Sequence, residues 1–194
     1  AMKKQVDASS YTTSRDTTLA SGRAGRHADR LRAALTALPR YRAVAAHAGD
    51  PDFDLKLTFA DEERALEEDP AFRALSGPRE RPDVVFRFRY ILCLGGNDVG
   101  SNFILGANSN ALVLREETGW EVFFDPLFRP WEHYVPLAPA AADLREKLAW
   151  ARGNPARCRE MVRAAQAACR VLAAPAVRRA MLGGILDGLG LRDR

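Results

Sequence analysis

The chain has 194 residues, 47% of them hydrophobic and 28% charged, which is typical of a globular domain with a core of its own. No apolar run reaches the roughly 20 residues that a membrane-spanning helix needs. The net charge of +4 comes from arginines scattered among carboxylates, which favours solvated helix faces over the dense basic patch of a nucleic-acid-binding protein. The three cysteines lack metal-ligand spacing and are interpreted as reduced core residues: Cys93, Cys158 and Cys169.

The N-terminal part of the chain is predicted to be a polar arm followed by a helix. Residues 1–25 are rich in Ser, Thr, Gly and Arg and are interpreted as an arm or linker. Leucines and alanines recur at helical spacing over residues 26–38, and Pro39 is expected to end that helix. Residues 26–194 are predicted to form a single domain.

Three short segments follow before the centre of the chain. The apolar run 42–46 predicts a strand. Alternating acids over residues 50–54 invite a metal interpretation, but the glycine and distal glutamate of a calcium loop are absent, so no metal site is expected. Residues 62–75 predict a short exposed helix.

The centre of the chain is predicted to be a βαβ unit. Residues 88–94 form an aromatic and branched apolar run that indicates a buried strand. Gly95-Gly96-Asn97-Asp98 is a turn, residues 101–109 predict a helix, and residues 111–114 predict a second, parallel strand. Such a turn suits phosphate binding, because glycine allows close approach and the first helical amides point outward. A turn that binds nothing is an equally good interpretation of these four residues.

The C-terminal third predicts one more strand and three helices. Residues 120–127 show a short helical stripe, and residues 134–137 predict a strand. Asp143 and Glu146 have the spacing of a capping box. The later helices are predicted from an apolar stripe and two proline breaks: one begins at Asn154-Pro155 and runs to Leu172, and the last spans residues 177–189.

Together these elements predict an α/β fold, with about four parallel strands and helices on both faces of a Rossmann-like sheet. Ligands in such sheets bind at the carboxyl ends of the strands. The turn from Gly95 to Asn102 and the turn after Leu114 should therefore meet at one edge of the sheet.

Four motifs in fixed order resemble glycosyltransferase family 90, the protein O-glucosyltransferase and capsule- or lipopolysaccharide-modifying group. They are Arg-Tyr-Ile-Leu-x-x-x-Gly-Asn-Asp-Val-x-Ser-Asn from Arg89, Ser-Asn-x-x-Val-Leu from Ser109, Leu-x-x-Pro-x-x-His-Tyr-Val-Pro-Leu from Leu127, and Asp-Leu-x-x-Lys-Leu-x-Trp from Asp143. The resemblance covers residues 85–173, and the Gly-Asn-Asp-Val variant is similar to the bacterial branch. It implies the C-terminal, donor-binding half of a GT-B glycosyltransferase that uses a UDP-sugar, without a cofactor or an essential metal.

The resemblance also implies donor-binding residues. By position they are Gly96, Asn97, Asp98, Val99, Ser101, Asn102, Ser109, Asn110, Arg15 and Glu121. Arg15 is placed there because family members carry an arginine segment at this distance ahead of the strand, and a surface loop is the competing interpretation. Animal members have an arginine where Asn102 stands, so the charge of the diphosphate must be neutralised elsewhere. His133 is interpreted as a structural histidine rather than a base.

The implied function is transfer of a hexose or pentose to a protein, polysaccharide or lipopolysaccharide acceptor. The catalytic residue is unknown, because the family's catalytic aspartate lies in an N-terminal half that has no counterpart here. The alternative is a non-catalytic nucleotide-binding or assembly module that keeps the fold. Expected partners are the nucleotide-sugar donor, the acceptor and the missing N-terminal domain. The expected location is the cytoplasm, or the inner membrane face through partners.

Overall fold

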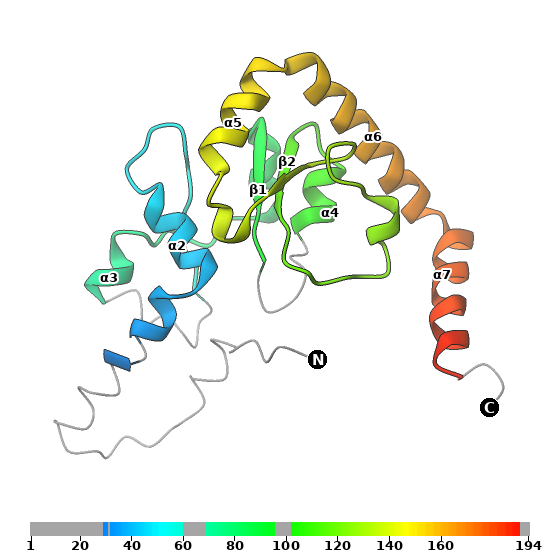
Figure 1. Ribbon diagram of the computed structural model, residues 1–194, viewed down its shortest axis with the longest axis horizontal. Helices are drawn as coiled ribbons and strands as arrows, with labels where there is room; N and C mark the ends of the chain where they lie inside the picture. The colour runs from blue at the N-terminus through cyan, green and yellow to red at the C-terminus, as the bar shows by residue number, and fades with distance from the viewer. Residues whose placement is uncertain (1–28, 31, 60–68, 96–101, 191–194) are drawn as a thin grey trace. The chain divides into compact units, whose positions relative to one another are not determined.

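The structure is a computed structural model that describes residues 29–30, 32–59, 69–95 and 102–190 (Figure 1). The chain separates into two compact units, Ala1–Arg81 and Pro82–Arg194. The predicted polar arm lies outside the described residues. The assignment of residues 26–194 to one domain stays a prediction.

The first unit contains helices around a small core. Residues 29–30 and 32–36 are helical, and α2 (Pro39–Ala46) and α3 (Pro70–Arg73) follow. Leu57 and Ser76 form an isolated parallel bridge. The core consists of five buried side chains: Leu35, Val44, Leu57, Phe72 and Leu75.

The strand predicted over residues 42–46 is wrong, because these residues belong to α2. Pro39 occupies the first turn of that helix, where its fixed φ favours helix formation and its missing N–H has no cost. Ala43 and Val44 are apolar because they form the buried side of the helix. Half of the exposed helix predicted over residues 62–75 lies outside the described residues, and in the other half only α3 is helical. The predicted exposure is wrong for Phe72, which is buried.

The second unit holds the sheet and its helices. In chain order it contains η3 (Pro82–Arg87), β1 (Tyr90–Cys93), α4 (Asn102–Ala107), β2 (Leu112–Glu116), η4 (Asp125–Leu127), β3 (Val135–Leu137), η5 (Pro139–Ala141), α5 (Leu144–Gly153), α6 (Pro155–Ala173) and α7 (Pro175–Gly188). The predicted strands at 88–94, 111–114 and 134–137 are confirmed with shifted ends. Among the described residues the sheet has three strands rather than about four, since the 42–46 segment is helical.

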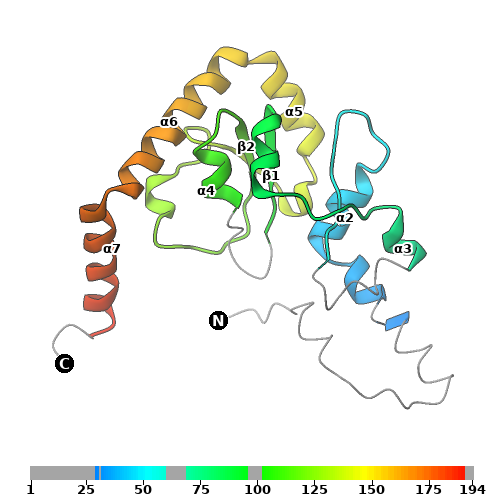
Figure 2. The same ribbon diagram turned by 180° about the vertical axis from the view of Figure 1, so that it is seen from behind.

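The three strands run parallel in the order β1-β2-β3. Ile91 pairs with Val113, and Leu114 pairs with Val135. Every residue of β2 is buried, as expected for a central parallel strand covered on both faces. In both views β1 and β2 lie between α4 and α5 (Figures 1 and 2), so the prediction of helices on both faces is confirmed.

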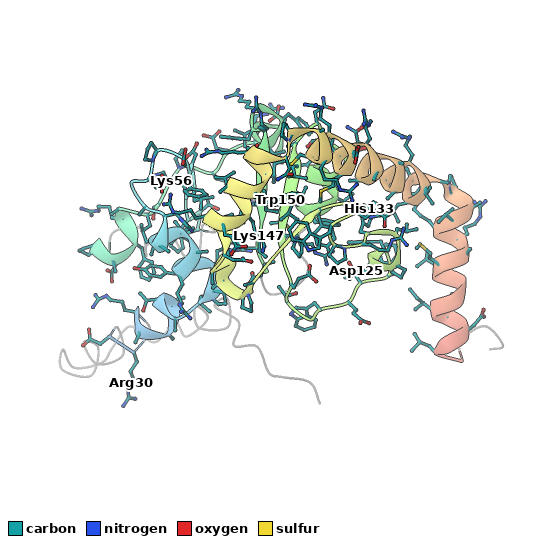
Figure 3. The ribbon with its side chains drawn as sticks, turned by 45° about the horizontal axis from the view of Figure 1, so that its top comes forward. Arg30, Lys56, Asp125, His133, Lys147 and Trp150 are labelled. Carbon is teal, nitrogen blue, oxygen red and sulfur yellow. The ribbon has the colours of Figure 1, made fainter. Side chains whose placement is uncertain are left out.

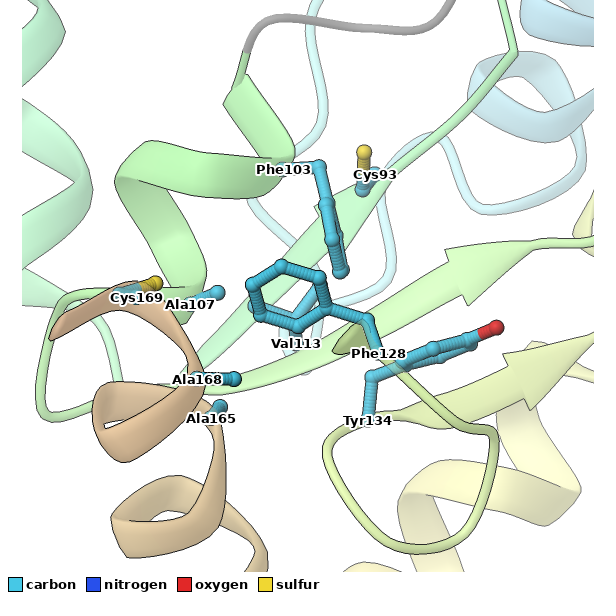
Figure 4. Packing of buried hydrophobic residues seen from close by; sticks show 9 residues of the cluster. All are labelled: Cys93, Phe103, Ala107, Val113, Phe128, Tyr134, Ala165, Ala168 and Cys169. Atoms are coloured by element: carbon cyan, nitrogen blue, oxygen red, sulfur yellow. The ribbon is translucent and has the colours of Figure 1, made fainter. Parts of the chain in front are cut away.

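Phe103 of α4 is the centre of the main core, and it is 1% exposed (Figure 4). Its ring makes edge-on contacts with Phe128 and Tyr134, at centroid distances of 5.0 and 5.6 Å. Ala165 and Ala168 of α6 close this core from the helix side. Full burial of a phenylalanine contributes about 2–3 kcal/mol, so this cluster holds α4, α6 and the segment before β3 together.

The C-terminal helices begin as predicted but are capped differently. Pro155 starts α6, whose buried stripe follows the predicted spacing: Cys158, Met161, Ala165, Ala168 and Cys169. The capping box is wrong: Asp143 precedes α5 but makes no capping bond. Its Oδ1 accepts a hydrogen bond from the Ala138 N–H at 2.8 Å, and its Oδ2 pairs with Lys147 at 3.4 Å. The Asp143 carboxylate therefore fixes the loop that precedes α5 and does not cap the first turn of that helix.

Candidate functional site

A cleft of about 230 Å³ opens beyond the carboxyl end of β2, the edge at which parallel α/β sheets bind ligands. It is lined by the end of β2, the turn after it, the start of η4 and the segment before β3. The lining residues are Arg115, Glu116, Glu117, Thr118, Gly119, Trp120, Glu121, Asp125, Phe128 and Tyr134.

Arg115 supplies the positive charge of this cleft. Its side chain is 10% exposed, and its Nη2 donates to Asp125 Oδ1 at 3.0 Å. The guanidinium carbon lies 4.5 Å from the centroid of the Phe103 ring and 5.3 Å from that of Tyr134. The aromatic rings thus hold a planar cation in one orientation. Asp125 also accepts from the Val122 N–H at 2.8 Å, which fixes the wall of the cleft.

Glu116, which lines the cleft, binds two backbone segments. Its Oε2 accepts from the Gly95 N–H at 2.8 Å, and its Oε1 accepts from the Ala140 N–H at 2.6 Å. The side chain is buried, so both bonds act in a low-dielectric environment where charge-assisted hydrogen bonds are strong. Glu116 therefore links the end of β1 to the loop after β3.

Gly95 is required by close packing. A Cβ at this position would lie 2.4 Å from Thr118 Cγ2 and 3.3 Å from Glu116 Oε2. Gly95 leads directly into the predicted phosphate turn, whose residues Gly96, Asn97, Asp98, Val99 and Ser101 lie outside the described residues. The structure thus places the entrance of that turn beside the cleft.

The loop after β3 is strained. Ala140 and Ala141 have φ values of 55° and 51°, in the left-handed region. This conformation costs about 1–2 kcal/mol for each non-glycine residue. The hydrogen bond from the Ala140 N–H to Glu116 offsets part of that cost.

Tyr134 and Glu117 form a polar pair at the wall of the cleft. Burial raises the pKa of the Tyr134 hydroxyl above its usual value, and the hydrogen bond to the Glu117 carboxylate raises it further. The phenol therefore stays neutral and its O–H donates a hydrogen bond to the Glu117 carboxylate. The backbone of Glu117 is fixed by its N–H, which donates to Leu137 O at 3.1 Å.

The carboxylates of the cleft are largely engaged by protein groups. Glu116, Glu117 and Asp125 accept the hydrogen bonds described above, whereas Glu121 is exposed. Within the described part of the chain no group of three or more His, Cys, Asp or Glu side chains is arranged to hold a metal ion.

Four of the predicted donor-binding residues are described, and one of them lines the cleft. That residue is Glu121. Asn102 joins the end of β1 to the start of α4, because its Oδ1 accepts from Cys93 Sγ at 3.1 Å and its Nδ2 donates to Leu92 O at 3.4 Å. Arg15 lies outside the described residues, as do residues 96–101 of the glycine turn.

Ser109 and Asn110 lie in the connection from α4 to β2, at the amino end of that strand. The Ser109 Oγ donates to Gly106 O at 2.6 Å and accepts from the Ala111 N–H at 3.0 Å. Asn110 Oδ1 accepts from Gln166 Nε2 at 3.1 Å. The structure does not bring these two residues to the cleft, and their role in donor binding stays a prediction.

Sequence reasoning placed the turn after Leu114 at the ligand-binding edge of the sheet but did not select Arg115, Glu116, Glu117 or Tyr134 as donor-binding residues. The sequence does contain a pattern that could have indicated Arg115, Glu116 and Glu117: charged residues that come at the end of a buried parallel strand lie at the ligand-binding edge of the sheet. Their mutual arrangement depends on contacts with residues more than ten positions away.

His133 is a structural residue, as expected from the sequence. Its Nδ1 accepts from the Arg129 N–H at 3.0 Å, and its ring lies edge-on to Phe128 at 5.8 Å. It does not line the cleft. In Figure 3, His133 and Asp125 both lie in the segment that connects β2 to β3.

The cleft lies at the carboxyl edge of a parallel sheet, where α/β units commonly bind their ligands. The sequence profile of glycosyl transferase family 90 matches residues 54–177, well over half of the chain. The chain therefore belongs to glycosyl transferase family 90.

Short stretches of the chain are similar to viral and mammalian proteins. One of 57 residues is 40% identical to uncharacterized protein 035R of Invertebrate iridescent virus 3, and it covers 29% of this chain and 5% of the viral protein. Another of 90 residues is 29% identical to protein O-glucosyltransferase 3 of Rattus norvegicus, covering 46% of this chain and 18% of the rat protein. The chain thus spans a small part of these relatives. Among the described residues no helix combines the length and apolar character required to cross a bilayer.

Proposed function

We propose that the unit Pro82–Arg194 is the donor-binding half of a GT-B glycosyltransferase that uses a UDP-sugar. The observation that carries the proposal is the cleft at the carboxyl end of β2, which contains a buried arginine and lies within the region matched by family 90. The sugar would be a hexose or pentose, and the acceptor a protein, polysaccharide or lipopolysaccharide. The cytoplasm or the inner membrane face of a bacterium is the proposed location.

The chemistry of the cleft suits both parts of such a donor. The Arg115 guanidinium has five N–H donors, and one of them is bound by Asp125. It is the candidate for neutralising the diphosphate, a role that the asparagine at position 102 cannot fill. Glu121 is exposed at the cleft and can accept hydrogen bonds from ribose or sugar hydroxyls.

The residues described here position the donor rather than activate the acceptor. Direct displacement at the sugar carbon requires a carboxylate that takes the proton of the acceptor hydroxyl. The family resemblance assigns that group to the N-terminal half, so the catalytic base is proposed to come from there. The family resemblance implies no cofactor and no essential metal, and none is proposed.

Ligand-induced stabilisation tests the proposal. The melting temperature of the chain is measured with and without UDP, UDP-sugars, GDP, ADP or NAD. A ligand that binds the folded chain and is present at 100 times its Kd adds about 2.7 kcal/mol to the free energy of unfolding. We expect UDP and a UDP-sugar to raise the melting temperature. We expect Glu121→Ala, and changes at Asn97 and Ser101, to reduce that rise, while the exposed control Asp187→Ala on α7 retains it.

The possible outcomes separate the proposal from its alternative. The absence of a shift with any nucleotide would contradict donor binding by this chain. A UDP shift in a full-length protein that neither transfers nor hydrolyses the sugar would favour a non-catalytic nucleotide-binding module.

A further inference from the structure

The last helix of the chain leaves an apolar stripe uncovered. Four aliphatic side chains on α7 and directly after it are between 42% and 65% exposed: Leu182, Ile185, Leu186 and Leu189. Their spacing of i, i+3, i+4 and i+7 places them on one face of the helix. In both views α7 extends from the end of α6 and away from the sheet (Figures 1 and 2). We call these four residues the α7 stripe, and a patch of this kind on a globular protein marks a contact surface.

The α7 stripe is separate from the donor cleft. None of its residues lines that cleft. The match to family 90 ends at residue 177, before the stripe begins at Leu182. The helix itself packs against α6, and its Gly183 is buried. The stripe is therefore not part of the donor-binding chemistry, and its exposed side chains contribute little to folding.

Two arginines extend the same face toward the start of α7. Arg178 and Arg179 precede Leu182 by four and three positions, so they lie on the side of the helix that carries the stripe. Both are exposed, and neither forms an ion pair among the described residues. The long stem of an arginine can lie along an apolar surface while its guanidinium reaches a polar layer. One face of α7 therefore combines a cationic end with an aliphatic end.

The neighbouring helix α6 adds to the positive charge. Together α6 and α7 contain six arginines and two carboxylates. Arg159, Arg163 and Arg170 recur at i, i+4 and i+11 on one exposed face of α6, and within the part of the chain that the structure describes they form no ion pair. An excess of cations on two consecutive helices creates a positive potential that attracts an anionic surface.

An anionic lipid surface matches both ends of this helix face. Aliphatic side chains enter the boundary between headgroups and acyl chains, and arginines pair with the lipid phosphates above that boundary. A second copy of the chain would bring the same arginines into the contact, and like charges oppose it. A helix of 14 residues is about 21 Å long, which is shorter than the roughly 30 Å of the hydrocarbon core, so α7 would lie along the surface.

We propose that α7 binds the surface of a membrane that contains anionic lipids, with the α7 stripe in the interface and Arg178 and Arg179 on the lipid phosphates. The arginines of α6 strengthen the attraction from outside the bilayer. This contact goes beyond donor binding, and it would hold the unit Pro82–Arg194 at a lipid surface whatever nucleotide the cleft takes.

Co-sedimentation of the full chain with lipid vesicles tests this proposal. One set of vesicles is phosphatidylcholine alone, and the other contains about one third phosphatidylglycerol. We expect saturable binding to the anionic vesicles that weakens as salt is raised, because screening reduces the attraction to the phosphates. Leu182→Gln/Leu186→Gln should weaken this binding about tenfold or more, since two leucines leave the interface. Arg178→Gln/Arg179→Gln should also weaken it and reduce its dependence on salt.

Matched controls come from η3. Phe86→Gln removes an exposed aromatic side chain and Arg87→Gln removes an exposed cation, and both variants should bind vesicles like the parent. Glutamine preserves helix propensity, so the α7 variants should keep the circular dichroism and the melting temperature of the parent.

Several results would overturn the proposal. They are absence of binding to the anionic vesicles, equal binding to the two kinds of vesicle, and equal binding by the parent and Leu182→Gln/Leu186→Gln. A parent that is a dimer and becomes a monomer in that variant would also overturn it, because a second copy would then cover the stripe. Thermal stabilisation by UDP is measured on the same proteins and should be unchanged in every variant, so failure of membrane binding and failure of donor binding are separate results.

Discussion

Removal of the Glu116 carboxylate is expected to destabilise the second unit strongly. Glu116→Ala deletes two hydrogen bonds to partly buried backbone N–H groups, those of Gly95 and Ala140, at 2.8 and 2.6 Å. A hydrogen bond to a charged group contributes about 1.5–3 kcal/mol, and an unsatisfied buried donor carries a penalty of similar size. Relief of the desolvation of the carboxylate and of the strain at Ala140 and Ala141 offsets part of this loss. We therefore expect a loss of about 3–5 kcal/mol in the free energy of unfolding.

Glu116→Gln provides a second test of the same reasoning. The amide keeps one acceptor oxygen but places an NH2 group opposite the other backbone N–H. We expect a loss of at least about half that of Glu116→Ala, because one of the two bonds is replaced by a donor facing a donor.

The assay is urea unfolding monitored by tryptophan fluorescence. All three tryptophans lie in the unit Pro82–Arg194, so the signal reports on the unit that contains Glu116. Glu160→Gln, an exposed position on α6, is the control and should change stability by less than about 0.5 kcal/mol. A loss of less than about 1 kcal/mol in Glu116→Ala would refute the view that this carboxylate holds the two loops together.

Three further changes test the same region. Gly95→Ala should destabilise the unit by about 1–3 kcal/mol in a urea titration, because its Cβ would lie 2.4 Å from Thr118 Cγ2. Adding Thr118→Ser removes that methyl group and should recover most of the lost stability. If the double variant does not recover stability, this contact is not the cause of the loss. Arg115→Met should lower the free energy of unfolding by about 3 kcal/mol, because it leaves the Asp125 carboxylate without its cation. In thermal unfolding, the double variant Arg115→Met/Asp125→Asn should lose less stability than Arg115→Met alone. An equal loss in the single and the double variant would argue against the pairing. The raised pKa of Tyr134 stabilises the fold below the unfolded-state pKa of about 10, and this contribution is lost as pH rises above that value. The free energy of unfolding should therefore fall more between pH 9 and pH 11 in the parent than in Tyr134→Phe. An equal fall in the two proteins would contradict the burial of the Tyr134 hydroxyl.

The parts of the fold that were correctly predicted have strong local signals. The apolar runs of β1 and β2 and the glycine turn between them indicated a parallel unit, and the structure confirms that pairing. The long apolar stripe of α6 at helical spacing was equally clear, and Pro155 begins that helix as expected. In each case the pattern along the chain repeats with the period of the element it forms.

Short segments were the ones that the sequence did not specify. Residues 42–46 were predicted to form a strand because they are an apolar run, and such a short run does not distinguish a strand from a helix. They form the end of α2, which begins at Pro39. Asp143 has the spacing of a capping residue, but it binds the Ala138 N–H of the preceding loop. Propensity is a weak prior over so few residues, and a nearby tertiary partner overrides it.

The sequence by itself determined the order of the three strands and of the helices α4, α6 and α7, together with the parallel pairing at the centre of the chain, because these follow from local periodicity and from the geometry of parallel strands. Only the tertiary structure decided which side chains form the cleft. The Arg115 guanidinium lies over the rings of Phe103 and Tyr134, and Glu116 joins Gly95 to Ala140 across 21 and 24 positions of sequence. Such contacts depend on where packing brings distant segments together, and no pattern within a single segment records them.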